Sequence, residues 1–207
     1  LSEMTSEISA HYFGSSSDST VGVTVINLKT GETFGASGQT VTPMESNLNP
    51  VKVMLLISLL QQEQGLSGDE LLSYTVDSVG GLTVQQIIDS QLMQTQSNER
   101  NIADRLERYL SDPTRVDAVR ELLASFNMTA TDISAGTSTT EDVARFWAFM
   151  HEEGISDEAV SQSISLALTT RNTEQVSHRP LYKQDSRGMV LPLMYYSRGF
   201  DPNNAES

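Results

Sequence analysis

The sequence predicts an α+β fold in which strands near both ends of the chain flank a block of helices. Residues 21–36 form a run rich in β-branched residues, then a turn and a second short run, as in a β-hairpin. Residues 47–170 are mostly helical in pattern, and residues 189–199 return to strand character. We therefore expect a single domain over residues 1–207, with an antiparallel sheet built from the chain termini and a helical lobe inserted between its strands.

The elements can be assigned in order from composition and spacing. The hairpin consists of strands over 21–28 and 33–36, joined by the turn 29–32. Apolar residues crowd after Pro50 as in a well-buried helix, which ends near Gly65. The predicted helices span 1–13, 51–64, 83–110, 116–126, 140–153 and 157–170, and a last strand spans 188–196.

The composition is that of a globular chain with an excess of acidic residues. With 207 residues, 38% of them hydrophobic, the chain can bury a sizeable core. The net charge of -14 argues against nucleic acid as a partner, because phosphate binding needs clustered Lys and Arg. The absence of cysteine and of a histidine pair at ligand spacing predicts no metal site, and we expect no cofactor. The longest apolar run, 53–60, is too short to form a transmembrane segment.

Five segments occur in the same order as in serine β-lactamases of class A and penicillin-binding proteins. The hairpin leads to Pro43-Met-Glu-Ser46 and an apolar helix, which resembles the family's Pro-Met-Ala-Ser segment at the head of a buried helix. The other segments are Gly65-Leu-Ser67 with Asp69-Glu70, Tyr74-Thr75, Thr83-Val84 with Ile87-Ile88, and Thr139-Thr140 with Asp142-Val-Ala144. The resemblance runs from about Val21 to about Leu168 and implies a β-lactamase/transpeptidase-like fold.

The first catalytic motif of that family is degraded in this chain. Ser46 falls on the nucleophile, but Asn49 falls on the lysine of the Ser-x-x-Lys motif. A serine hydroxyl needs a base to take its proton, and an amide has no useful basicity. Lys52 does not replace the missing lysine, because six residues place it about 240° around the helix from Ser46. Asn49 and Pro50 also suit the N-cap and first position of a helix, which would leave Ser46 a surface serine one turn outside it.

The second motif, Ser-Asp-Asn on the helical lobe, is also altered. An ungapped match from Thr83 places Thr95-Gln96-Ser97 on it and Asn101 on the asparagine that follows. A competing register places Ser97-Asn98-Glu99 on the motif but needs two inserted residues and loses Asn101. We prefer the first register, in which Thr95 replaces one hydroxyl by another.

The third motif and the loop of the deacylating glutamate complete the comparison. Lys-Thr-Gly would fall on Ser197-Arg198-Gly199, where Arg198 offers a cation for a carboxylate but lies one residue out of place. The loop that carries the glutamate in class A corresponds to residues 127–138, which are few and contain one carboxylate, Asp132.

Three interpretations follow. The one we favour is a non-catalytic β-lactamase- or penicillin-binding-protein-like domain, a binding or scaffold module that is extracellular or held in the cell envelope by a segment absent from this chain. Its partner would be a cell-wall peptide or a protein. The second is an active serine hydrolase, performing acyl transfer of the β-lactamase or D,D-peptidase type with Ser46 as nucleophile and an unrecognised base. The third is a purely structural interaction domain with no ligand.

The end of the chain raises a separate question. In the family, the strand of the third motif is followed by two strands that lie between it and the N-terminal hairpin. Only residues 200–207 follow Gly199, and they are polar and contain a proline. Either the natural polypeptide continues past Ser207, or another segment or chain fills the gap, or the resemblance fails in this region; we favour the first explanation.

Overall fold

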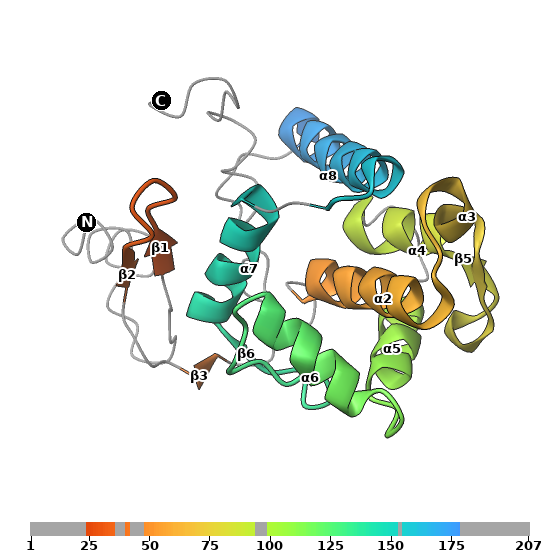
Figure 1. The fold of residues 1–207 in the computed structure, drawn as a ribbon. Helices are drawn as coiled ribbons and strands as arrows, with labels where there is room; N and C mark the ends of the chain where they lie inside the picture. The colour runs from red at the N-terminus through yellow and green to blue at the C-terminus, as the bar shows by residue number, and fades with distance from the viewer. Residues whose placement is uncertain (1–23, 36–39, 42–47, 94–98, 153–154, 179–207) are drawn as a thin grey trace. The chain divides into compact units, whose positions relative to one another are not determined.

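A computed structural model describes residues 24–35, 40–41, 48–93, 99–152 and 155–178 (Figure 1). Helices and short antiparallel strand pairs make up these residues, so the predicted α+β class is confirmed at that level. The predicted helix 1–13 and the predicted strand within 189–199 lie outside the described residues. Pairing of that strand with the hairpin therefore stays a prediction.

The contacts divide the chain into two compact units. Unit 1 comprises residues 1–48 and 110–154, and unit 2 comprises residues 49–109 and 155–207. The boundaries fall at the start of the helix 49–64, near the end of the helix 99–110 and shortly after the helix 140–152.

The hairpin of unit 1 forms as predicted, with a shorter first strand. β1 (Thr24–Ile26) pairs antiparallel with β2 (Thr33–Gly35). The carboxamide oxygen of Asn27 accepts hydrogen bonds from the backbone N–H groups two and three residues further on, at 2.9 and 3.2 Å. Gly31 then adopts a φ of 71°, which a glycine tolerates without strain. Because the Asn27 turn begins there, the strand ends at Ile26 instead of continuing to residue 28.

Among the described residues, unit 1 has four further elements. They are β3 (Thr40–Val41), α6 (Val116–Ser125), β6 (Ser138–Thr139) and α7 (Thr140–Glu152). β3 pairs antiparallel with β6, a pairing that the sequence did not predict. β1 lies against α7, where the hydroxyls of Thr24 and Thr140 are 2.8 Å apart and share a hydrogen bond.

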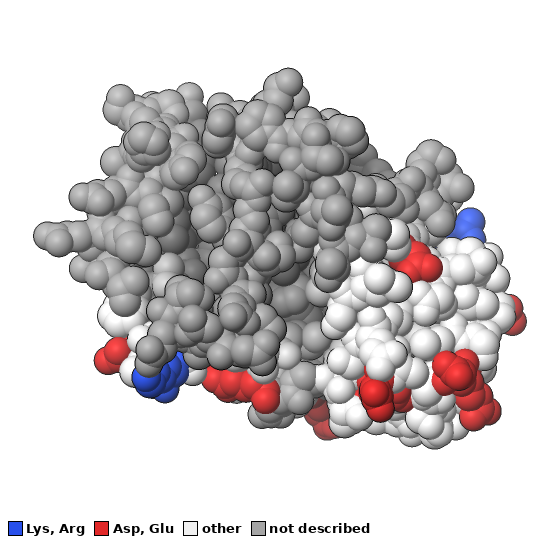
Figure 2. Space-filling model, turned by 90° about the horizontal axis from the view of Figure 1, so that it is seen from above, with Lys and Arg blue, Asp and Glu red and all other residues white. Residues whose placement is uncertain are grey.

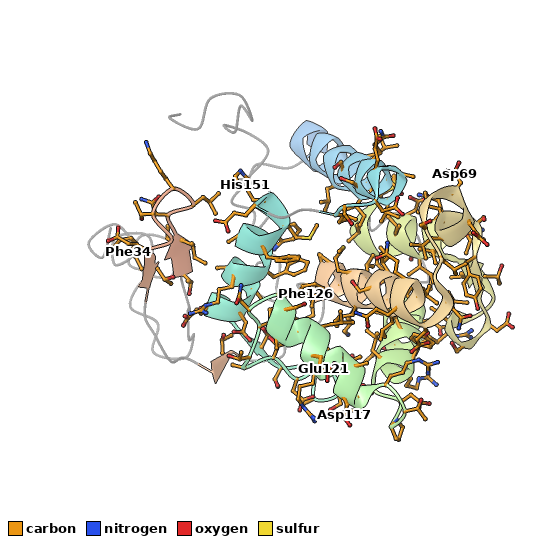
Figure 3. The ribbon with its side chains drawn as sticks, viewed as in Figure 1. Phe34, Asp69, Asp117, Glu121, Phe126 and His151 are labelled. Atoms are coloured by element: carbon orange, nitrogen blue, oxygen red, sulfur yellow. The ribbon has the colours of Figure 1, made fainter. Side chains whose placement is uncertain are left out.

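An aromatic cluster forms the core between α6 and α7. Phe126 follows α6, and its ring lies 5.9 Å from that of Phe146 in an edge-on arrangement and 5.0 Å from that of Phe149 (Figure 3). Phe146 is completely buried and also meets Trp147 edge-on at 5.2 Å. Such geometries are favourable for aromatic rings. Phe146 is thus the buried member of the group, whereas Trp147 and Phe149 are half-buried.

Unit 2 is mainly helical (Figure 1). Its elements are α2 (Asn49–Gln64), α3 (Gly68–Ser73), β4 (Thr75–Val76), η2 (Asp77–Val79), β5 (Leu82–Thr83), α4 (Val84–Ile88), η3 (Asp89–Met93), α5 (Glu99–Leu110) and α8 (Glu158–His178). α2 begins at Asn49, slightly before the predicted start, and Gly65 ends it in a left-handed conformation with φ 67°. α2 packs against α3, α4 and η3.

Two helix predictions for unit 2 are corrected. The predicted helix 83–110 consists of α4, the π-helix η3 and α5, with residues 94–98 outside the described residues. The π-helical turn was not predicted; such turns are rare and occur mostly inside α-helices. The helix predicted to end at residue 170 continues as α8 to His178. Residues 171–178 have no apolar periodicity, but Arg, Glu and Gln among them have good helix propensity.

One carboxylate caps two helices of unit 2 at once. Asp157 precedes α8, and its Oδ1 accepts a hydrogen bond from the backbone N–H of Val160 at 3.2 Å. Its Oδ2 accepts one from the N–H of Gly68, the first residue of α3, at 2.6 Å. A carboxylate at a helix start satisfies unpaired N–H groups and interacts favourably with the helix dipole. Asp157 therefore ties the start of α3 to the start of α8.

We predict that Asp157→Ala lowers the free energy of unfolding by about 2 kcal/mol, since an ordinary cap contributes about 1 kcal/mol and this residue supplies two. Asp157→Asn should cost less, because its amide oxygen still caps one helix. Urea denaturation followed by circular dichroism measures both. Equal losses for the alanine and asparagine variants would contradict the double-cap interpretation.

Candidate functional site

The structure describes two of the seven residues predicted at the degraded motifs. These are Asn49 and Asn101. The other five lie outside the described residues: Ser46, Thr95, Ser97, Ser197 and Arg198. The structure therefore leaves the assembly of these seven residues into one site as a prediction.

Asn49 occupies the first turn of α2 and is buried, with 7% of its surface exposed. Its Oδ1 accepts no hydrogen bond from the described residues. A buried carbonyl oxygen without a partner is unfavourable. The group at the expected position of a catalytic base is thus a neutral, buried amide.

Asn101 lies on the exposed surface of α5. Its Oδ1 accepts a hydrogen bond from Nε of Arg105 at 2.9 Å, one helical turn further on. Side chains four residues apart on a helix commonly pair in this way. Asn101 and Asn49 share no hydrogen bond, and the contact that Asn101 makes is one of helix stabilisation.

The most unusual charged group in unit 2 is Lys52. It is 1% exposed, although lysine is rarely buried to this extent. Its Nζ donates a hydrogen bond to Oε2 of Glu107 on α5 at 2.6 Å, and the two side chains are 2% and 32% exposed. The amine faces a carboxylate inside the protein and is removed from solvent. Sequence analysis missed the pairing, although Lys52 is visibly the one charged residue in the apolar run from Leu48 to Leu60.

A second buried polar pair lies in the π-helix η3. Ser90 and Gln91 are 0% and 1% exposed, and Nε2 of Gln91 donates to Oγ of Ser90 at 3.3 Å. π-helical turns are frequent at functional sites. Here both side chains are packed in the interior, so this turn carries polar groups in the core of the unit.

The loop that would hold the deacylating glutamate in the resembled family has its own hydrogen bonds. Oδ2 of Asp142, a buried residue of α7, accepts hydrogen bonds from the N–H of Ala130 at 2.8 Å and from Oγ1 of Thr131 at 2.7 Å. Asp142 therefore anchors the start of the loop to α7 through two neutral donors. It is a structural carboxylate of unit 1.

The carboxylate of Asp132 accepts hydrogen bonds from residues of the same loop. The hydroxyl of Ser134 donates to its Oδ1 at 2.6 Å, and the N–H of Ala135 does so at 3.1 Å. These bonds, the hydroxyl bond foremost, hold the pKa of Asp132 below its ordinary value of 3.8. A carboxylate with a lowered pKa is a weaker base. Asp132 thus closes a turn and is poorly suited to activating a water molecule.

On the face shown in Figure 2, the charged side chains of the described residues are mostly acidic. Asp69 and Glu70 in the first turn of α3 are exposed. The whole chain has 27 acidic and 13 basic residues. Within the described ranges, no three His, Asp or Glu side chains are grouped closely enough to hold a metal ion. Nor does any helix there have the length and apolar character needed to cross a membrane.

No family model matches the sequence, and no curated protein or solved structure matches it either. The resemblance to β-lactamases and penicillin-binding proteins accordingly rests on the motifs in the sequence.

We predict that the backbone N–H resonances of Ser134 and Ala135 titrate with a midpoint below 3.8, the ordinary value for the Asp132 carboxyl. Because the folded-state pKa is lowered, the stabilisation of the turn is present above the unfolded-state pKa. It is lost as the pH falls through the folded-state pKa. NMR titration of the full chain measures this midpoint.

In Asp132→Asn the same resonances should show no titration in this range, because the amide keeps an acceptor but not the charge. A midpoint at or above 3.8 in the unchanged protein would contradict the hydrogen-bonding cause.

Proposed function

We propose that this chain is a non-catalytic relative of β-lactamases and penicillin-binding proteins, retained as a binding or scaffold module. The proposal rests on one observation: the described residues that could act as the base are unsuited to accept a proton. Asn49 offers an amide where acyl transfer needs an amine, and Lys52, three residues further on, has its amine enclosed against Glu107.

Acylation of a serine requires a base within hydrogen-bonding reach of its hydroxyl, about 3 Å. A neutral amide cannot accept the proton. The amine of Lys52 would have to leave a buried ion pair to do so, which costs several kcal/mol. Asp132, the one carboxylate of the shortened loop, is engaged in its own turn. Among the described residues, the candidates Asn49, Lys52 and Asp132 are thus chemically unsuitable or already engaged.

The proposal includes a specific arrangement of the strands. The hairpin 21–36 and the strand within 189–199 would share one antiparallel sheet, as in the β-lactamase/transpeptidase arrangement. The location would be extracellular or in the cell envelope. The partner would be a cell-wall peptide or a protein, and the acidic surface favours a partner with basic groups. The order of the sequence segments supports these points.

We predict no hydrolysis of a chromogenic cephalosporin above the rate of a Ser46→Ala control. Steady-state absorbance measurements on the two proteins at equal concentration test this. Intact-protein mass after exposure to penicillin or to a fluorophosphonate provides the second measurement. A turnover rate clearly above the control, or a stable adduct on Ser46, would support the alternative of an active serine hydrolase and refute the proposal.

We also predict that Asn49→Lys alone does not restore labelling by penicillin. The substitution supplies an amine but leaves Thr95-Gln96-Ser97 at the second motif, and catalytic groups that act as a unit are strongly non-additive. It also buries a second amine one helical turn from Lys52, so we expect a loss of stability of about 3 kcal/mol. Intact mass and urea denaturation measure the two effects.

Asn49→Leu is the matched control for that experiment. It removes a buried carbonyl oxygen that has no described partner, and we expect its stability to stay within about 1 kcal/mol of the unchanged protein. Covalent labelling of Asn49→Lys would show that the remaining groups are competent and would contradict our interpretation of the second motif.

A further inference from the structure

The packing of α2 leaves its orientation weakly specified by hydrophobicity. All residues from Asn49 to Ile57 are buried, which amounts to more than two helical turns. Ordinary amphipathic helices have one apolar face, and that face fixes which side points inward. In α2, apolar residues point in every direction. A rotation of the helix by about 100°, the angle between successive residues, exchanges one set of apolar side chains for another.

Lys52 distinguishes one orientation of α2 from the others. It is the one charged residue between Leu48 and Leu60, and its amine is buried. Any rotation or axial shift of α2 that separates the amine from Glu107 leaves a buried ammonium without its carboxylate, which is strongly unfavourable. The carboxylate comes from α5, so the pair relates two helices that are 55 positions apart in sequence at the contact.

We propose that the Lys52–Glu107 ion pair selects one orientation of α2 against α5 from several that apolar packing allows. The pair acts by making the alternative packings unfavourable. Its net contribution to the stability of the native packing is small, because removing both charges also removes the cost of taking them out of water. This role is independent of the proposed function of the chain.

The two partners differ in exposure, and this predicts an asymmetry between single variants. Glu107→Gln leaves a nearly completely buried ammonium opposite an amide, and we expect the Tm to fall by about 10 °C. Lys52→Met leaves a carboxylate that is 32% exposed and can regain water, so its fall should be smaller, about 5 °C.

The double variant Lys52→Met/Glu107→Gln is the decisive test. We expect its Tm to return to within about 3 °C of that of the unchanged protein. At the same time, its two-dimensional amide NMR spectrum should show broadened or doubled resonances for α2 and α5, and it should bind the dye ANS several times more strongly. A Tm near the original together with heterogeneous packing would show that α2 no longer has one preferred orientation.

The matched control is Arg120→Gln/Asp117→Asn, which removes an ion pair on the surface of α6 whose side chains are 72% and 91% exposed (Asp117 is labelled in Figure 3). It should change neither the Tm nor the line widths. Two outcomes for the buried double variant would overturn the proposal. A sharp single-state spectrum with little ANS binding would show that apolar packing alone selects the orientation. A Tm as low as that of Glu107→Gln would show that the pair supplies stability instead of selecting a packing.

Discussion

Unit 2 depends on the burial of α2. The residues from Asn49 to Ile57 are all buried, so every polar group among them lies in a medium where water is scarce. Lys52 meets this constraint with a carboxylate from α5, and the buried Ser90 and Gln91 of the adjoining η3 meet it with each other. The carbonyl oxygen of Asn49 accepts no hydrogen bond from the described residues. The helices around α2 are therefore held by apolar packing and by a small number of obligatory polar contacts.

In unit 1, a buried charged group is stabilised by neutral hydrogen-bond donors. Asp142 is buried like Lys52, yet the partners of its Oδ2 are a backbone N–H and a hydroxyl. Its place in the first turn of α7 also gives it the favourable end of the helix dipole. A buried acid at a helix start can accept from N–H groups that are not bonded within the helix, whereas a buried amine near the start of α2 meets carbonyl groups that are already bonded within the helix. This difference explains why α2 needs an acidic partner from a distant segment.

Much of the local structure was predictable because short-range signals determine it. The hairpin and its turn follow from β-branched residues around Asn27 and Gly31, and the ends of α6 and α7 were placed within one residue. The sequence did not predict contacts between segments that are distant from each other along the chain. The pairing of β3 with β6 joins residues about a hundred positions apart, and no local pattern in either two-residue strand predicts it. The same holds for Lys52, whose burial was visible in the sequence while its partner Glu107 was not.

The segments that resemble β-lactamases owe much of their character to helix ends. Thr83 and Gln86 form a capping box at the start of α4, Oγ1 of Thr139 accepts the N–H of Asp142 at the start of α7, and Gly65 ends α2. These residues are required by the local fold whether or not the chain performs chemistry. Asn49, in the first turn of α2, is likewise compatible with a helix start. Under the non-catalytic role that we propose, the caps and turns keep the fold while the motif positions are free to differ.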